Sequence, residues 1–505
     1  MFWADKVAAD VIAAKKPKPY WVDDMKTPSG FSHVGSMMGP VIHSMIFRAI
    51  KDAGQKATFT FVINDFDTMD ELSPDLKEDF RQYMGMSLKQ VPSPVTKYGN
   101  LADYYASDFI NSSKSLGVEA EFLSSWELYH QGKFDGVIKD ALDNAEKIQD
   151  IYQRISGSQK KASGWLPLQV ICEKCGKLGT TKVFAWDGKL VSYKCEPALV
   201  KWAVGCGHEG KISPFGGSGK LPWKVDWAAH WKVIGITVEG AGKDHASKGG
   251  SYDIAMVLCE EVFKYEKPFR LPYEFILIGG KKMSSSKGIG LKAHDLVKIL
   301  PPQVGRFLFA RSGIKSQTNF DPIETNAIPV LFDDYQKAAD AYFNKGDEDL
   351  ARAFELSQIG EIQKSPTIRF SALAQWVQMP NMEEEIKKEG LDNWAEYARV
   401  WVEKFAPESD KFTVQKNLPA AVQGLTVEQK EFLKKVAGEL DKASDGEEFQ
   451  TRIYDISKEM GLSGKEAFAA IYLSLIGKDH GPKAAWLILS LEKEFVENRF
   501  NEASK

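Results

Sequence analysis

The stretch Pro28–Ser36, with the sequence PSGFSHVGS, has the residue types of a phosphate-binding turn. Glycines let backbone amides come close to a ligand, and the first turn of a helix offers free N–H donors with partial positive charge. His33 would stand in that turn and point to the same place. The stretch therefore predicts a nucleotide phosphate site. The alternative is that Gly30 and Gly35 only ease a tight turn and helix packing, with His33 an ordinary first-turn residue.

A second stretch, Lys281–Gly288 with the sequence KKMSSSKG, offers three lysines and three hydroxyls beside a glycine. A mobile loop of this composition can close on a triphosphate and stabilise the charge that develops on leaving pyrophosphate. The alternative is a solvated surface loop rich in lysine and serine. The two stretches together favour nucleotide chemistry over either alternative.

The elements around these stretches predict an α/β fold with a parallel, doubly wound sheet of the Rossmann type. Strand, helix and strand follow one another at Tyr20–Met25, His33–Ala53 and Thr58–Asn64. After an inserted module, we expect two more strands and a helix at Trp231–Glu239, Phe275–Ile278 and Ser247–Phe263. The loop rich in lysine and serine would then follow a late strand of the same sheet.

Helical periodicity dominates the chain beyond Leu291, where little strand signal remains. We expect helices at Asp333–Phe343, Ala351–Gln358, Met382–Phe405, Val427–Lys442, Phe449–Met460, Lys465–Ile476 and Lys483–Glu497. The C-terminal third is therefore predicted to be an all-α bundle.

Four of the five cysteines lie between Cys172 and Cys206, which indicates metal binding in a reducing compartment rather than disulfides. A Cys172-x2-Cys175 pair with two later ligands suits tetrahedral zinc in a ribbon-like module. Cys195 and Cys206 are the simplest completion, and Cys206 with His208 is the alternative. A degenerated ribbon without metal is the third interpretation. Zinc here would be structural, because no site-like carboxylate accompanies the cysteines.

The composition of the 505 residues is that of an ordinary globular protein, with 43% hydrophobic and 27% charged residues. It excludes disorder, collagen-like repeats and a disulfide-stapled miniprotein. A net charge of −4 excludes a globally basic nucleic-acid coat but not a local basic groove. The charged N-terminus reads as an amphipathic helix rather than a signal peptide, and no apolar run is long enough to span a membrane. We therefore expect a cytoplasmic protein.

HVGS at residues 33–36 and KMSSS at residues 282–286 resemble the HIGH and KMSKS signatures of class I aminoacyl-tRNA synthetases. Ser36 replaces the second histidine, so the role of that histidine would be either absent or taken over by a hydroxyl. Ser285 replaces the lysine, which would leave phosphate charge compensation to Lys282 and Lys287. With KLPWKVDWAAHW, GKDH and the late segment Phe468–Ile488, these motifs resemble class I lysyl-tRNA synthetase over essentially the whole chain.

The resemblance implies ATP-dependent activation of lysine to lysyl-adenylate and its transfer to tRNA(Lys), with Mg²⁺ accompanying ATP. It implies catalytic roles for His33, Lys282 and Lys287. It implies nucleotide contacts from Gly30, Ser32, Gly35, Ser36, Asp244, His245, Met283, Ser284, Ser285 and Ser286.

The resemblance and the patterns together give five expected parts. Residues 1–110 and 221–290 would form the two halves of the catalytic domain, and 111–220 the inserted module with the cysteines. Residues 291–365 would contact the tRNA stem, and 366–505 would form an α-helical anticodon-binding domain. The sequence leaves the oligomeric state open, with a monomer plausible for a chain of this size.

A lysine pocket needs an apolar slot for the methylenes and a carboxylate for the ammonium, and an aromatic wall would add attraction. Trp223 and Tyr273 are the candidates for the wall. The candidates for the carboxylate are Asp226, Asp65 and Asp67, of which the last two follow the end of a predicted strand. Core packing for the aromatic residues and turn formation for Asp65 and Asp67 are the alternatives.

Two other functions stay open on the sequence alone. A class I synthetase for glutamate or glutamine would need an arginine where Asp226 or Asp65 stands. A catalytically silent tRNA-binding relative would have lost the loop rich in lysine and serine, which is intact here.

Overall fold

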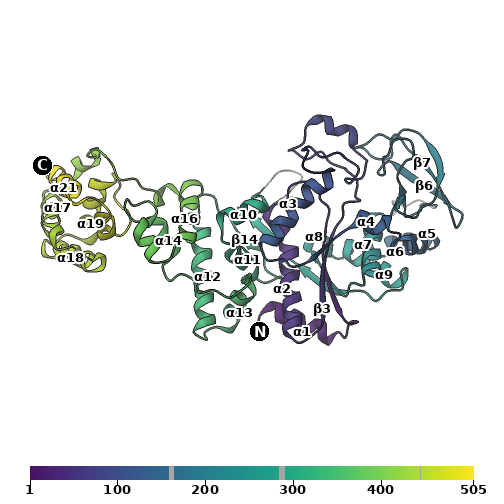
Figure 1. Cartoon of the computed structure of the whole chain (residues 1–505), viewed down its shortest axis with the longest axis horizontal. Coiled ribbons are helices and arrows are strands. Elements are labelled where there is room, and N and C mark those ends of the chain that lie inside the picture. The colour runs from purple at the N-terminus through teal and green to yellow at the C-terminus, as the bar shows by residue number, and fades with distance from the viewer. Residues whose placement is uncertain (158–163, 284–289, 444) are drawn as a thin grey trace. The chain divides into compact units, whose positions relative to one another are not determined.

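The computed structural model describes residues 1–157, 164–283, 290–443 and 445–505 (Figure 1). Contacts within the chain define two compact units, Met1–Phe320 with Ala338–Gln363, and Asp321–Lys337 with Lys364–Lys505. Helix α12 (Ala327–Phe343) contributes residues to both units. The finer division into five parts stays a prediction.

A six-stranded sheet, parallel at every pairing, forms the centre of the first unit, as predicted. Its strands are β1 (Tyr20–Asp23), β2 (Met25–Lys26), β3 (Ala57–Ile63), β4 (Glu121–Ser124), β10 (Val238–Gly242) and β11 (Phe269–Tyr273). The order is β11-β10-β1-β3-β2, with β4 also paired to β3. Strands buried on both faces read as continuous apolar runs, and the run in β3 is of that kind.

Helices α2 (Met38–Asp52), α3 (Leu101–Ser115), α7 (Trp223–Ile234) and α9 (Ser251–Glu261) belong to the same unit. The predicted strand at Trp231–Glu239 is wrong. Its first residues complete α7, and Gly235 ends that helix with a φ of +93° before β10 begins at Val238. Aromatic residues favour strands on average, but here the indoles of Trp227 and Trp231 stand one helical turn apart on a single face.

The inserted module carries two small antiparallel sheets. One joins β6 (Thr181–Trp186), β7 (Val191–Cys195) and β8 (Glu209–Ile212), and the other joins β5 (Gln169–Val170) to β9 (Gly219–Lys220). Its helices and flanking elements are α4 (Ser125–His130), α5 (Asp135–Asp143) and α6 (Ala145–Ser156). The segment before Trp223, residues 213–220 (SPFGGSGK), has the glycine-rich composition of a flexible hinge, but it ends in Lys220, which is buried.

The remaining elements of the first unit lead to and from the two motifs. They are α1 (Trp3–Ala13), η1 (Val34–Met37), η2 (Glu78–Tyr83), α8 (Lys243–Ala246), β12 (Ile276–Ile278), β13 (Lys281–Lys282), α10 (Ala293–Ile299), α11 (Pro302–Ala310), β14 (Thr318–Asn319) and α13 (Glu348–Ser357). β12 pairs with β13 in an antiparallel manner and with β14 in parallel. The expectation that the strand before the loop rich in lysine and serine belongs to the central sheet is therefore wrong, because β12 lies in a separate three-stranded sheet.

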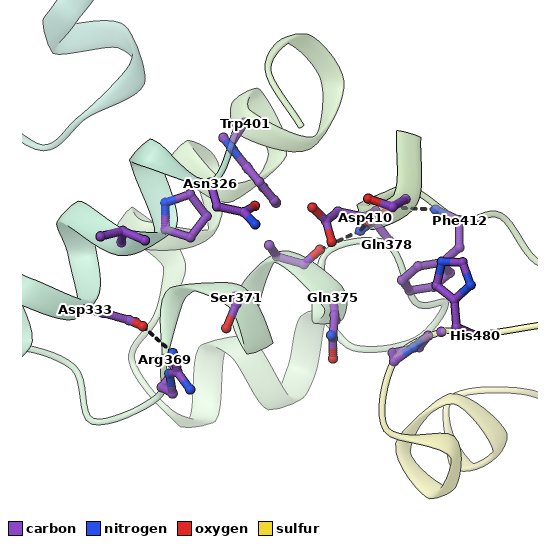
Figure 2. A pocket seen from close by; sticks show the side chains of 16 residues that line it. Asn326, Asp333, Arg369, Ser371, Gln375, Gln378, Trp401, Asp410, Phe412 and His480 are labelled. Carbon is purple, nitrogen blue, oxygen red and sulfur yellow. Dashed lines mark hydrogen bonds and ion pairs between the residues drawn. The ribbon is translucent and has the colours of Figure 1, made fainter. Parts of the chain in front are cut away.

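The second unit has helices and no strands among its described residues, as predicted for the C-terminal third. Besides the start of α12 it contains α14 (Phe370–Trp376), α15 (Glu383–Lys388), α16 (Asp392–Lys404), α17 (Val427–Glu439), α18 (Gly446–Glu459), α19 (Gly464–Leu475), α20 (Ala484–Leu489) and α21 (Lys493–Ala503), with short turns η3 (Glu408–Asp410), η4 (Ala420–Gly424) and η5 (Leu440–Lys442). The helix expected at Met382–Phe405 is divided at Gly390, whose φ is +66°. Residues of α12, α14 and α16 line a pocket (Figure 2). None of the helices in the described parts of the chain is both long and apolar enough to cross a bilayer.

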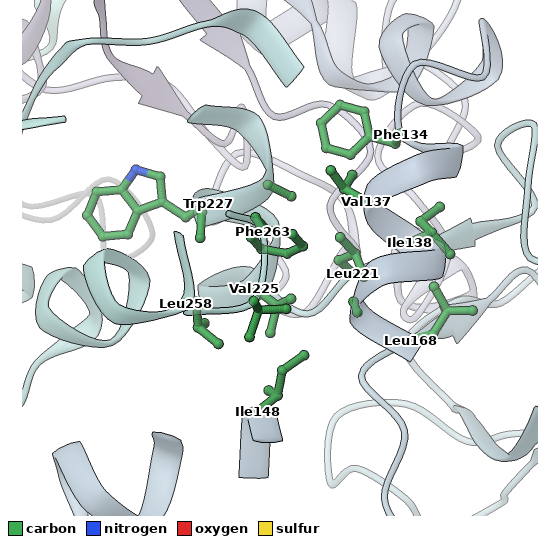
Figure 3. Close-up of a cluster of buried hydrophobic side chains, with 14 of the residues drawn as sticks. Phe134, Val137, Ile138, Ile148, Leu168, Leu221, Val225, Trp227, Leu258 and Phe263 are labelled. Carbon is green, nitrogen blue, oxygen red and sulfur yellow. The ribbon is translucent and has the colours of Figure 1, made fainter. Parts of the chain in front are cut away.

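One buried apolar cluster joins the inserted module to the sheet (Figure 3). The apolar face of α5, with Val137 and Ile138, is turned toward Val225 of α7 and Leu221 just before it. Burying a side chain of this size contributes about 1.5–3 kcal/mol. The cluster therefore holds α7, and with it Trp223 and Asp226, in a fixed place beside the end of the sheet.

Candidate functional site

His33 stands at the start of the turn between the first strands and α2. It is the N-cap of η1, and its Nδ1 accepts a hydrogen bond from the Ser36 amide at 3.1 Å. This bond makes Nδ1 the acceptor, so the neutral ring carries its proton on Nε2. The turn thus combines a ring N–H donor with the backbone amides of a helix start.

The loop rich in lysine and serine is attached to this turn on both sides. Met283 is 2% exposed, and its Cε lies 3.1 Å from the place that a Cβ would take on Gly35. On the other side, the Val34 amide donates to the Leu291 carbonyl at 2.8 Å, and the Ala293 amide donates to the Ser32 carbonyl at 2.7 Å. The structure therefore brings Ser32, Gly35 and Met283 together. Gly30, in the turn just before Ser32, is buried.

The predicted roles of Ser284, Ser285, Ser286 and Lys287 fall outside the described residues. Of Lys282, the structure gives the backbone, which pairs with Leu277 in the β12–β13 ladder. The catalytic roles of Lys282 and Lys287 stay predictions.

The GKDH segment lies beside the predicted tryptophan wall. The ring centroid of His245 is 5.8 Å from that of Trp223 and 5.9 Å from that of Trp227. Burial, helped by the charge of Lys224, lowers the pKa of His245, which favours the neutral ring. Asp244 belongs to the same short helix, α8, and is exposed. The structure thus places Trp223 and His245 together at the carboxyl end of β10.

Two buried carboxyls lie under this wall. Asp23 and Glu239 are opposite each other on β1 and β10, and both are fully buried. Glu239 accepts hydrogen bonds from the indoles of Trp227, at 2.6 Å, and Trp231, and Asp23 accepts one from Thr60. Burial, reinforced by repulsion from neighbouring carboxylates, raises the pKa of both groups well above the ordinary carboxyl range. The indoles of Trp227 and Trp231 therefore serve the buried carboxyl of Glu239.

Asp226 and Asp67 both contact the side-chain ammonium of Lys220. Lys220 Nζ lies 2.8 Å from Asp226 Oδ2 and 3.0 Å from Asp67 Oδ1, and the lysine is 4% exposed. Asp226 also accepts a hydrogen bond from Tyr129, and Asp67 accepts one from Thr27 at 2.5 Å. Burial would raise the pKa of Asp226, but the Lys220 charge outweighs it and lowers that pKa.

Asp65 caps the start of α4. Its carboxylate accepts hydrogen bonds from the Ser124 hydroxyl at 2.6 Å and from the Trp126 amide at 2.7 Å. Lys89 approaches it to 3.5 Å. All three carboxylates predicted to meet a substrate ammonium therefore already have partners inside the protein.

Asp24, which the sequence analysis did not select, is placed differently. It follows β1 directly, and its side chain is 10% exposed. The place that a Cβ would take on Gly39 overlaps Asp24 Oδ2, and the hydroxyl of Tyr273 lies 3.2 Å from the same point. An acid directly after a buried strand was the signal that selected Asp65. It applies equally to Asp24 but was not used there.

His43 supports this corner as a neutral ring. Nδ1 donates to the Gly39 carbonyl at 2.7 Å, and Nε2 accepts from the Gly240 amide at 2.8 Å. Both ring nitrogens are thus committed to the backbone, and the 3.6 Å separation of Nδ1 from Asp24 Oδ2 is not an ion pair.

The four predicted cysteine ligands meet in the inserted module. The sulfurs of Cys172, Cys175, Cys195 and Cys206 all lie within 4.8 Å of one another, and they could hold a metal ion. The separations Cys172–Cys206 and Cys175–Cys195 are both 3.7 Å. Tetrahedral zinc with Zn–S bonds of about 2.3 Å sets its sulfurs about 3.8 Å apart, so this donor set fits. His208 is not part of the group.

The second unit contains a pocket of about 280 Å³ that could not be found from the sequence (Figure 2). Arg369 and Asp333 form an ion pair at one end of it, and His480 and Phe412 lie at the other. Two buried polar atoms of its lining, Asp333 Oδ1 and Trp401 Nε1, have no hydrogen-bond partner among the residues that the structure describes.

Comparisons with known proteins agree with these arrangements. The family described as tRNA synthetases class I (K) matches residues 1–360. A lysine–tRNA ligase of Archaeoglobus fulgidus is 32% identical over 100% of both chains. That of Methanosarcina barkeri is 33% identical over 99% of this chain and 97% of its own, and that of Methanocaldococcus jannaschii is 32% identical over 99% of each.

Among solved structures, a glutamate tRNA ligase from Elizabethkingia meningosepticum in complex with its amino acid is similar over 96% of this chain and 99% of its own. Its sequence identity is 13% and its TM-score 0.47, which is too distant a likeness to carry an argument.

Proposed function

The chain belongs to the class I (K) family of tRNA synthetases, and on that premise we propose that it is a lysine–tRNA ligase working at the site around His33. The observation that carries the site assignment is the attachment of the loop rich in lysine and serine to the histidine turn, through Met283 on one side and Leu291–Ala293 on the other. A nucleotide bound between the histidine turn and this loop would therefore contact both segments, and a shift of either one would change its binding.

In the first step, a carboxylate oxygen of lysine attacks the α-phosphorus of ATP. The bond from that phosphorus to the bridging oxygen breaks, and pyrophosphate leaves with the electron pair. The amides of η1 and the Nε2–H of His33 would bind phosphate oxygens, and Lys282 and Lys287 would offset the charge that develops on pyrophosphate. Mg²⁺ arrives with ATP and needs no protein cage of its own.

In the second step, a terminal ribose hydroxyl of tRNA attacks the carbonyl carbon of lysyl-adenylate, and AMP leaves. The reaction needs the two partners held in line more than it needs a nucleophile from the protein. Ser32, Ser36, Asp244, His245 and the serines of the loop are proposed to position the nucleotide.

The lysine side chain is proposed to lie between Trp223 and Tyr273. Asp67 and Asp226 would not bind the substrate but would shape this pocket by holding Lys220 in place. Asp65 would shape it by capping α4. Thr27, in the segment that leads into the histidine turn, is held by Asp67 at 2.5 Å, which links the pocket to the nucleotide turn.

The second unit is proposed to bind the anticodon arm of tRNA, with an unstacked base in the pocket of Figure 2. Trp401 Nε1 and Asp333 Oδ1 both belong to the lining and have no hydrogen-bond partner among the described residues. Aromatic surfaces favour stacking of an unstacked base. A zinc ion at the cysteine cluster is proposed to hold the inserted module together.

The function is tested by exchange of radiolabelled pyrophosphate into ATP, measured with each of the twenty amino acids, with and without bulk tRNA. Exchange that depends on lysine is expected. Exchange with glutamate or glutamine instead would overturn the assignment of the substrate but keep the nucleotide site. No exchange under either condition would favour a protein that only binds tRNA.

A further inference from the structure

We propose that Asp24 accepts the side-chain ammonium of the lysine substrate, beside the hydroxyl of Tyr273, an assignment that rests on the proposed function. This assignment identifies Asp24 as the residue that selects an amino acid with a positively charged side chain. The carboxylates selected from the sequence are not suited to the task, because Asp67 and Asp226 already hold Lys220 and Asp65 already caps a helix.

The carboxylate of Asp24 has capacity left for a ligand. Within the described residues, its one hydrogen bond comes from the Met25 amide to Oδ1, at 2.8 Å. Nδ1 of His43 lies 3.6 Å from Oδ2, but its N–H is committed to the Gly39 carbonyl. Lys26, two residues further on, acts on Asp24 at longer range, and no lysine or arginine of the described residues lies within the 4.0 Å of an ion pair.

A buried carboxylate without a cation is costly, and a substrate ammonium would relieve that cost. Burial raises the pKa of Asp24, although the hydrogen bond from the Met25 amide and the charge of Lys26 oppose the rise. A substrate carboxylate would be repelled here, so the corner favours lysine over glutamate.

Gly39 makes this arrangement possible. Any side chain at residue 39 would put its Cβ where Asp24 Oδ2 lies. Tyr273 reaches the same point from the end of β11, so the carboxylate faces an aromatic residue that can pack on the methylenes of a lysine. The first turn of α2 therefore requires glycine at residue 39, because the Asp24 carboxylate occupies the space that a side chain would need.

Two variants act on this carboxylate independently. Asp24→Asn removes its charge and keeps its shape. Gly39→Ala keeps the charge but displaces the group, while alanine itself favours the helix. Asp143→Asn, at an exposed position of α5, is the matched control for loss of one charge. The assay is lysine-dependent pyrophosphate exchange by the full chain, with KM measured separately for lysine and ATP.

We expect both variants to raise the KM for lysine by about 30-fold or more, the loss typical of a buried charge pair with one partner removed, and to change the KM for ATP about twofold at most. Selectivity for lysine over norleucine, which has the same chain without the ammonium, should fall by a similar factor. The control should match the parent protein.

An Asp24→Asn protein that folds and keeps both the KM for lysine and the selectivity against norleucine would overturn the assignment of Asp24. If that variant does not fold, Gly39→Ala decides in the same way. A parent protein that shows exchange with another amino acid, or none, would refute the proposed function itself, so the two failures are distinguishable.

Discussion

The terminal methyl of Met283 packs on Gly35, 3.1 Å from the place where a Cβ would stand. The same place is 3.1 Å from the ring of His33. Glycine at residue 35 therefore lets the backbone of the histidine turn, the histidine ring and the start of the loop rich in lysine and serine meet at one point.

Gly35→Ala is expected to slow lysine activation because the added methyl must push Met283 or His33 aside. Contacts of 3.1 Å require a shift of a few tenths of an ångström, which is well below the displacement of about 1 Å that can cost about 100-fold in rate. We therefore expect the rate of pyrophosphate exchange at saturating substrates to fall severalfold, by less than about 100-fold. The KM for lysine should change little, since the lysine pocket is formed by other residues. Gly136→Ala, in α5 with open space around it, controls for the loss of a glycine in the same assay.

Lys220→Met is expected to destabilise the protein by about 3–5 kcal/mol, because it removes the cation shared by the fully buried Asp226 and the partly exposed Asp67. Chemical unfolding followed by circular dichroism measures the effect. Lys232→Met removes an exposed pair with Asp140 and should cost less than about 1 kcal/mol. Equal losses in the two variants would show that Lys220 is not held as tightly as its distances indicate.

The sheet and its two motif-bearing loops could be predicted because they depend on local patterns. The apolar run of β3 and the strand–helix–strand order are visible without knowledge of partners. The error at Trp231 has a physical cause: a residue type that favours strands was placed in a helix so that its indole N–H could reach Glu239, which belongs to another element. The strand propensity of a tryptophan carries no information about a hydrogen-bond partner elsewhere in the chain, such as Glu239.

The pocket carboxylates could not be ranked from the sequence for a similar reason. Asp67, Asp226 and Asp24 all look like acids near strand or helix ends. What distinguishes them is Lys220, which comes from a segment that reads as a flexible hinge, and Gly39, whose missing side chain makes room for Asp24. Both facts concern contacts between distant parts of the chain.

The unfolding free energy is expected to depend on the carboxyl pair Asp23–Glu239. Their raised pKa values mean that the folded protein keeps protons that the unfolded chain has lost. Above about pH 4, the ordinary carboxyl pKa, their contribution therefore falls as the pH rises toward the folded-state pKa, by up to about 1.4 kcal/mol per pH unit for each proton. Asp23→Asn should make this fall shallower.

The comparison is made as a difference between parent and variant, with urea unfolding at several pH values from about 5 to 8. His230 and His245, whose pKa values burial lowers, act in the opposite sense, because their contribution is lost as the pH falls. They are present in both proteins and cancel in the difference. Parallel curves for the two proteins would contradict the prediction.

The cysteine cluster is expected to bind one zinc ion per chain, measured by metal analysis of protein purified without added chelator. Cys206→Ser should lose the metal, because it removes one of four sulfurs that lie within 4.8 Å of one another. His208→Ala should keep it, since that ring is outside the group. Removal of zinc by a chelator should lower the melting temperature. Retention in Cys206→Ser with loss in His208→Ala would reverse the ligand assignment.

The pocket of the second unit yields a test that separates tRNA recognition from chemistry. Trp401→Phe removes the unpartnered N–H and keeps an aromatic ring, so it should weaken tRNA binding without unfolding the unit. Loss of one base contact costs about 1–3 kcal/mol, which corresponds to roughly a 10- to 100-fold higher KM for tRNA in the charging reaction. Pyrophosphate exchange should stay at the parent level if tRNA is not needed for activation. Tyr454→Phe, on an exposed part of α18, is the control. Unchanged charging by Trp401→Phe, together with reduced exchange, would remove the pocket from tRNA binding and point to a structural role for the indole.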